Sequence, residues 1–217
     1  MELVRDLRRA LSEGADLAEI RFDYLDPHDV PNVLENIKDI IPKCLFTLRS
    51  KSDHGFFEGM EKDRLSLLLR LANEKPALVD VELEALKRND ALADSLEASG
   101  ARILVSWHNF DETPVTEELI NIIGEMRKFS NYIKVVTMAK RLADSLRLIN
   151  LYEKTAGLQA IIFAMGEAGA ITRILCTVAG NAPFTYASLG KPIAPGQIPL
   201  ADMKRLYDLI CVRQKSR

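Results

Sequence analysis

Two apolar stretches decide the fold, ILVSWHNF at residues 103–110 and YIKVVT at residues 132–137. Each is a β-branched run of strand length, which predicts a buried β-strand. The first run delivers His108 just past its apolar part, where a strand gives way to a loop. The second carries Lys134 inside an otherwise apolar strand, so its ammonium must either reach solvent or lie desolvated in a cavity.

A desolvated lysine beside a histidine is a reactive pair. Burial disfavours the ammonium form of a lysine, and a neutral amine attacks carbonyl carbons to form a Schiff base. A neighbouring histidine can then move the protons. The alternative is structural, with Lys134 at the edge of the sheet and His108 in a solvated loop. Each residue taken alone favours this structural interpretation.

Strand and helix patterns alternate along the whole chain. Strands are predicted at residues 17–23, 43–48, 77–83, 102–106, 133–137, 159–164 and 184–187. Helices are predicted at residues 2–13, 29–40, 61–73, 85–99, 114–129, 140–155, 168–178 and 200–212, with Thr113 as the N-cap of the fifth. Repeats of roughly 24 to 34 residues are typical of an α/β chain folded as a (β/α)8 TIM-type barrel.

The chain has one predicted strand fewer than a (β/α)8 barrel contains. Seven strand patterns are present, and the chain begins with a helix where a barrel begins with a strand. We therefore predict a barrel that lacks its first strand, with a gap beside the strand carrying Glu19 and Arg21 and an upstream start in a longer form. A doubly wound sheet is the architectural alternative, but the chain has no glycine-rich nucleotide loop.

Composition and charge limit the classes of protein to which the chain can belong. The chain has 217 residues, 47% of them hydrophobic and 28% charged, with a net charge of −2, which fits one catalytic domain over residues 1–217. No basic stripe indicates nucleic acid, and no apolar run is long enough for a membrane span. Three widely spaced cysteines and the absence of a signal peptide at the amino terminus fit a cytoplasmic protein. The oligomeric state is open, a homodimer included.

Polar side chains gather at the predicted strand ends, where barrel enzymes place their sites. They are Glu19, Arg21, Arg49, Asp80, Glu82, His108 and Lys134, joined by Arg173 and Gln197 from later segments. Three arginines beside one lysine indicate an anionic substrate, because guanidinium matches a carboxylate bidentately. Asp80 and Glu82 could orient His108 or pair with the arginines.

At these residues the chain resembles the type I 3-dehydroquinate dehydratases of the shikimate pathway, which serves aromatic amino acid biosynthesis. The matching segments are EIRFD at 19–23, TLRS at 47–50, DVEL at 80–83, SWHNFDETP at 106–114, Lys134 in its strand, Met165–Gly166 leading to Thr172–Arg173, and APGQI at 194–198. The ordered set covers essentially the whole chain.

The resemblance implies a lyase that dehydrates 3-dehydroquinate to 3-dehydroshikimate without a metal or organic cofactor. It implies that Lys134 forms an imine with the C3 ketone and that His108 moves the protons. Substrate-binding positions carry over to Glu19, Arg21, Arg49, Arg173 and Gln197, with Arg173 on the carboxylate. The loop at 195–197 would close over the substrate, while Met165 and Tyr186 would line the pocket or fill the core.

The chain departs from the family pattern at three places. Asp53 stands where the family usually has a glutamate that supports the catalytic histidine, so that support is shorter here. Ile193 replaces a serine that often contacts substrate. The first strand is absent. His28 and His54 are interpreted as solvated loop residues.

Two other classes of function stay open at this point. Another Schiff-base lyase, of aldolase type, would share Lys134 without needing the arginines or the 194–198 loop. A non-catalytic barrel kept as an interaction partner is the second.

Overall fold

The computed structural model describes residues 2–190 and 194–214, and in residues 211–214 only the backbone. Contacts divide the chain into two compact units, each made of two segments. The first unit contains residues up to 107 together with 125–132. The second contains residues 108–124 together with the chain from 133 onward.

The first unit alternates short parallel strands with helices. Its elements are α1 (Glu2–Ser12), β1 (Ala18–Arg21), α2 (Val30–Asn36), β2 (Cys44–Thr47), α3 (Glu61–Asn73), β3 (Leu78–Glu82), α4 (Leu83–Arg88), α5 (Asp90–Ser99) and most of β4 (Ile103–Asn109). The strands pair in chain order, all in parallel. Parallel neighbours need a crossover between them, which the helices supply.

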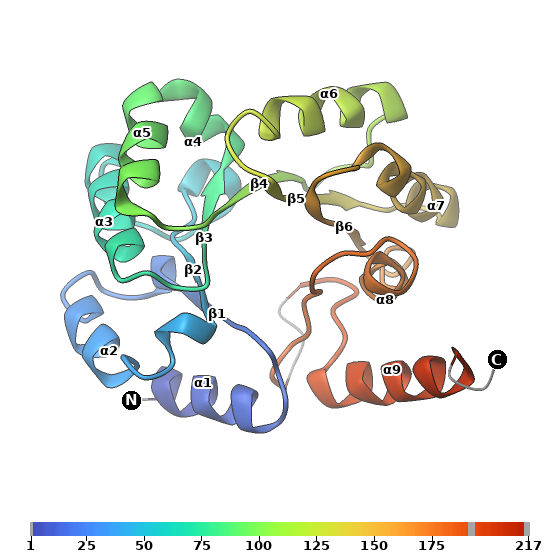
Figure 1. Ribbon diagram of the computed structural model, residues 1–217, viewed down its shortest axis with the longest axis horizontal. Helices are drawn as coiled ribbons and strands as arrows, with labels where there is room; N and C mark the ends of the chain where they lie inside the picture. The colour runs from blue at the N-terminus through green and yellow to red at the C-terminus, as the bar shows by residue number, and fades with distance from the viewer. Residues whose placement is uncertain (1, 191–193, 215–217) are drawn as a thin grey trace. The chain divides into compact units, whose positions relative to one another are not determined.

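The pairing register aligns the strand ends that carry the candidate residues. Arg21 pairs with Thr47, which pairs with Asp80, and Glu82 pairs with Ser106. All five residues of β3 are buried, as in a strand covered on both faces. Figure 1 shows α3 and α5 side by side on one flank of this sheet.

The second unit continues the alternation with most of α6 (Thr116–Met126) and of β5 (Tyr132–Met138), followed by α7 (Leu142–Asn150), β6 (Gln159–Met165), α8 (Thr172–Val178) and α9 (Leu200–Gln214). Strands β5 and β6 are neighbours in the sheet order. Helices α7 and α8 both pack on β6, as Figure 1 shows. No helix of the described residues is long and apolar enough to cross a bilayer.

The predicted strand at residues 184–187 is wrong. The described residues form six strands, and this segment contributes only an isolated bridge between Ser188 and Pro199. Two backbone bonds form there, from Ser188 N to Ile198 O and from Leu200 N to Ser188 O. Pro199 between them has no N–H to donate, so the ladder stops.

Several predicted helices also differ in their bounds. The helices predicted at 29–40, 114–129 and 140–155 are shorter, at Val30–Asn36, Thr116–Met126 and Leu142–Asn150. The helix predicted at 85–99 is two, α4 and α5, because the Asn89 side chain accepts from Leu92 N and starts a new helix. Thr113 is not the N-cap of α6; its hydroxyl bonds the Thr137 hydroxyl and the Met138 carbonyl instead. The helix predicted at 168–178 begins only at Thr172. Helix α3 agrees with its prediction at both ends.

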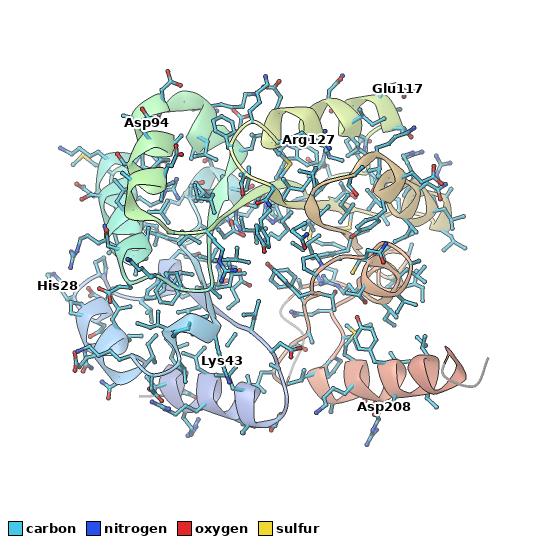
Figure 2. All side chains as sticks on the ribbon, in the orientation of Figure 1. His28, Lys43, Asp94, Glu117, Arg127 and Asp208 are labelled. Atoms are coloured by element: carbon cyan, nitrogen blue, oxygen red, sulfur yellow. The ribbon has the colours of Figure 1, made fainter. Side chains whose placement is uncertain are left out.

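Strand β1 pairs with β2 and with no other strand of the described residues, as expected for the strand beside the predicted gap. His28 and His54 are exposed loop residues, as predicted. Figure 2 shows His28 on the outer side of the first unit.

Candidate active site

In the first unit, Arg49 is the centre of a buried ion-pair network. Its Nη1 donates to Asp53 Oδ2 at 2.9 Å and to Ser106 Oγ at 2.8 Å, and its Nη2 donates to Asp80 Oδ1 at 2.8 Å. Ser106 Oγ donates in turn to Asp80 Oδ1 at 2.6 Å. The Arg49 side chain is 6% exposed and the Asp80 side chain 0%. Residues from β3 and β4 thus fix one guanidinium just after β2.

The charges around Arg49 determine its ionisation. Burial lowers the pKa of its guanidinium, but Asp80, Glu82, Asp53 and Glu19 together raise that pKa above its usual value. The resemblance assigned Asp53 to the support of His108; the structure gives the shorter carboxylate an ion pair with Arg49.

Arg21 and Glu19 lie at the end of β1 and are also held by neighbours. Arg21 donates two bonds to the buried Asp23, at 2.8 and 2.6 Å. Burial raises the pKa of Asp23, but the bonds and charge of Arg21 outweigh that effect and the pKa is lowered. The exposed Glu19 accepts the Thr47 hydroxyl at 2.7 Å. These contacts pre-orient both side chains.

Arg64 was missed by sequence reasoning. It lies in α3, is only 1% exposed, and donates to the Leu48 carbonyl at 2.6 Å and to Glu82 Oε2 at 3.1 Å. Glu82 is therefore an arginine partner, as is Asp80. A signal was present, because Arg64 stands three to four residues before Leu67 and Leu68 on the buried stripe of its helix.

In the second unit, Lys134 and His108 come from consecutive strands. Lys134 is the third residue of β5 and is 4% exposed, with its Nζ 5.0 Å from the ring centroid of Tyr186. His108 lies near the carboxyl end of β4 and is half-buried, with its ring stacked 5.6 Å from that of Phe110. Lys134 thus lies inside β5, and His108 lies at the second-last position of β4.

Arg173 completes a row of cations and aromatic rings in this unit. Its guanidinium lies 4.5 Å from the centroid of Phe163, whose ring is 5.7 Å from that of Tyr186. Phe184 lies 5.8 Å from Tyr186 on another side. Tyr186 thus forms an aromatic wall next to Lys134.

Arg173 differs from the other two arginines because its charge is uncompensated. Within the described residues it forms no ion pair, and its buried Nε has no hydrogen-bond partner. Burial lowers the pKa of its guanidinium to about 10, so it remains charged at neutral pH. A buried, charged and unpaired guanidinium is suited to bind an anion.

The segment that carries Gln197 is tied to the end of β6. Gly166 N donates to Pro195 O at 3.2 Å, and Gln197 N donates to Ala194 O at 3.1 Å. Gly166 and Gly196 have φ angles of 85° and 72°, which favour glycine. Met165, just before, is 6% exposed and packs in the core. Ile193 lies outside the described residues.

None of the described residues forms a cluster of three or more histidine, cysteine or acidic side chains that could hold a metal ion. The candidate residues offer an amine in Lys134, an imidazole in His108 and guanidinium groups in Arg21, Arg49 and Arg173. An amine with an imidazole suits covalent work on a carbonyl, and the arginines suit a carboxylate.

Comparisons with known proteins find one family along almost the whole chain. The type I 3-dehydroquinase family profile matches residues 1–214. A 3-dehydroquinate dehydratase of Methanopyrus kandleri is 34% identical over 93% of this chain and 90% of its own length. One of Methanothermobacter thermautotrophicus is 36% identical over 91% of this chain and 86% of its own.

A solved structure gives the same result for the fold. The crystal structure of 3-dehydroquinate dehydratase from Geobacillus kaustophilus superposes with a TM-score of 0.88 at 27% identity, covering 97% of this chain and 86% of that one. This likeness confirms the predicted α/β barrel class. With the family profile matching almost from end to end, the chain belongs to the type I 3-dehydroquinase family.

Proposed function

We propose that Lys134 carries the 3-dehydroquinate dehydratase reaction of this hydro-lyase as the Schiff-base residue. One observation carries the assignment: of the lysines in the described residues, Lys134 alone is buried, at 4% exposed. A lysine amine adds to carbonyl carbons to form Schiff bases, and burial shields this amine from bulk water. The Tyr186 ring beside its Nζ excludes water from that side.

The proposed reaction starts with attack of the Lys134 amine on the C3 ketone of 3-dehydroquinate. Loss of water gives an iminium, which withdraws electrons and acidifies the adjacent C2 proton. His108 takes that proton, the electron pair forms the new double bond, and the hydroxyl departs with a proton returned by His108. Hydrolysis of the imine then releases 3-dehydroshikimate and regenerates the amine.

Substrate binding is assigned to the residues that match the substrate-binding positions of the family. Arg173 takes the carboxylate, because its guanidinium has no competing partner in the described residues and lies along the aromatic row that leads to Lys134. Glu19, Arg21 and Arg49, held in place by Thr47, Asp23 and Asp80, bind the hydroxyl-bearing part of the substrate. Fixed polar groups lose little entropy on binding.

Gln197 is assigned to a loop that closes the site. The bond between Gly166 N and Pro195 O holds this segment against the end of β6, the strand that also presents Phe163. A loop held there can exclude water during catalysis. We further propose that the whole chain is one catalytic domain, since the family profile spans residues 1–214. A homodimer stays a prediction.

The test is a direct assay of dehydration. The purified chain is mixed with 3-dehydroquinate, and formation of the conjugated product is followed by its ultraviolet absorbance. We expect turnover by the wild type and none by Lys134→Met, with equal far-ultraviolet circular dichroism as the control for folding. Residual activity of Lys134→Met within tenfold of wild type would remove this lysine from the mechanism. An aldolase-type lyase would show no absorbance change.

A further inference from the structure

Both chain neighbours of Arg49 are held by one buried ion pair, Arg64 with Glu82. Arg64 Nη1 donates to the carbonyl of Leu48 at 2.6 Å, and Glu82 Oε1 accepts the backbone N–H of Ser50 at 2.7 Å. The pair itself is joined by Arg64 Nη1 and Glu82 Oε2 at 3.1 Å. The backbone on either side of Arg49 is therefore fixed by side chains from α3 and β3.

Arg64 is suited to this task because its whole guanidinium is engaged. Its Nε and Nη2 donate to the two oxygens of Glu61 at 2.9 and 2.7 Å, which leaves Nη1 to face Leu48 and Glu82. The Arg64 side chain is 2% exposed and that of Glu82 8%, while that of Glu61 is 57% exposed. One end of the planar group thus pairs with the exposed Glu61, and the other end reaches the end of β2.

Packing alone does not require an arginine at this position. Arg64 lies on the same helical stripe as Leu68 and Leu71, both fully buried, so an apolar side chain would continue that stripe. Buried ion pairs often add no net stability relative to apolar residues of similar volume. Their value lies in the geometry they impose, and here the geometry imposed is that of the residues flanking Arg49.

A close backbone approach completes the arrangement. Gly55 N donates to Ser50 O at 2.7 Å, and a Cβ at Gly55 would lie 2.2 Å from the Arg49 carbonyl oxygen. The loop after β2 therefore packs directly on the backbone of Arg49. The Arg49 side chain is itself held by Asp53, Asp80 and Ser106, so side chain and backbone are both fixed.

We propose that Arg64, acting through Glu82 and the Leu48 carbonyl, is a positioning residue that aims Arg49 at the substrate. The inference rests on the proposed role of Arg49 in substrate binding. Arg64 does not touch substrate in this arrangement; its loss moves the Arg49 guanidinium and so weakens binding. Displacements near 1 Å in a binding site cost as much as about 10²-fold.

The main variant is the double substitution Arg64→Met with Glu82→Gln. It removes both charges together, so no unpaired buried ion destabilises the fold. We expect KM for 3-dehydroquinate to rise at least about tenfold while kcat changes less than threefold, because ground-state positioning is lost and the Lys134 chemistry is retained. Urea unfolding confirms that the variant is folded under assay conditions.

Two further variants separate positioning from a general structural effect. Glu61→Gln removes the solvent-side partner of the same guanidinium but keeps the contacts to Leu48 and Glu82, and its KM should stay within twofold of wild type. Arg64→Lys retains the charge and can reach one of the two inner partners, so its KM should lie between those of the wild type and the double variant.

Arg49→Lys supplies the reference for the role of Arg49. If it raises KM and the double variant does not, the positioning role of Arg64 is overturned while the proposed function stands. If Arg49→Lys itself leaves KM unchanged, the substrate role of Arg49 fails and the inference fails with it. Arg64 would be purely structural if the double variant changed kcat, KM and stability together and if Arg64→Lys showed the same losses.

Discussion

Replacing Arg173 by methionine should weaken substrate binding and, at the same time, stabilise the free protein. Arg173 is 3% exposed, and its guanidinium has neither an ion pair nor an Nε partner among the described residues. Methionine fills a similar volume without a charge. Most substitutions at a binding residue are expected to leave stability unchanged or reduce it, so a gain would be a distinctive result.

The magnitude follows from the cost of burying the charge. The fall in the pKa of Arg173 from its ordinary value to about 10, at ~1.4 kcal/mol per pKa unit, puts that cost on the order of 3 kcal/mol. The variant also loses the contact with the Phe163 ring at 4.5 Å, which is worth about 0.5–2 kcal/mol. The free energy of unfolding should therefore rise by ~1–2 kcal/mol.

The effect on binding has the opposite sign. Leaving a substrate carboxylate without its charge partner costs about 2–5 kcal/mol, so KM should rise at least about 30-fold. Urea unfolding of the ligand-free protein and steady-state kinetics measure the two quantities on the same preparation.

Arg49→Met is the matched control. Its guanidinium has three partners, so its removal takes the arginine charge away from the buried Asp80 carboxylate and should lower the free energy of unfolding by about 3–5 kcal/mol. The reasoning about Arg173 would be refuted if Arg173→Met were as destabilising as this control, because Arg173 would then have a structural partner.

Three further perturbations test other parts of the account. His108→Ala should lower kcat by about 10²–10⁴-fold, since it removes the general acid and base, and a loss below tenfold would move that role elsewhere. Gly196→Ala should raise KM about tenfold and speed proteolysis of the loop, because a Cβ would lie 2.3 Å from the Gly166 carbonyl oxygen. An alanine at this positive φ also costs about 1–2 kcal/mol. An unchanged KM and an unchanged rate of proteolysis would show that the loop has no part in substrate binding. Asp23→Asn should reduce the free energy of unfolding at pH 7 by ~1.5–3 kcal/mol. Arg21 lowers the pKa of Asp23, so this contribution is present above the ordinary aspartate pKa of about 4 and lost as pH falls through the lowered value, and urea unfolding from pH 7 to pH 2.5 should show the two proteins converge.

The strand cores were predictable from sequence because most of their residues are apolar and buried. The runs around Phe46, Val79 and Val135 are fully buried, and no other local structure accommodates them as well. Helix ends were less predictable because they depend on side-chain competition. Thr113 could cap α6 in isolation, but its hydroxyl bonds Thr137 in the folded chain.

The candidate site divides in the same way. Lys134, His108 and Arg173 could be named as site candidates from sequence, because an ionisable residue within or just after an apolar segment stands out in the sequence. Partner choice was not visible, since Arg49 pairs with Asp80 across 31 residues and Arg64 reaches Leu48 across 16. Arg64 was missed because its burial depends on the strands beneath its helix.

The most direct test of the central claim is borohydride reduction of the protein during turnover. Borohydride reduces an iminium to a stable amine, so the covalent intermediate is trapped on the residue that formed it. We expect one substrate-derived adduct, located by peptide mass spectrometry on Lys134 and absent from Lys134→Met. No adduct under turnover, or an adduct on another lysine, would contradict the Schiff-base role of Lys134.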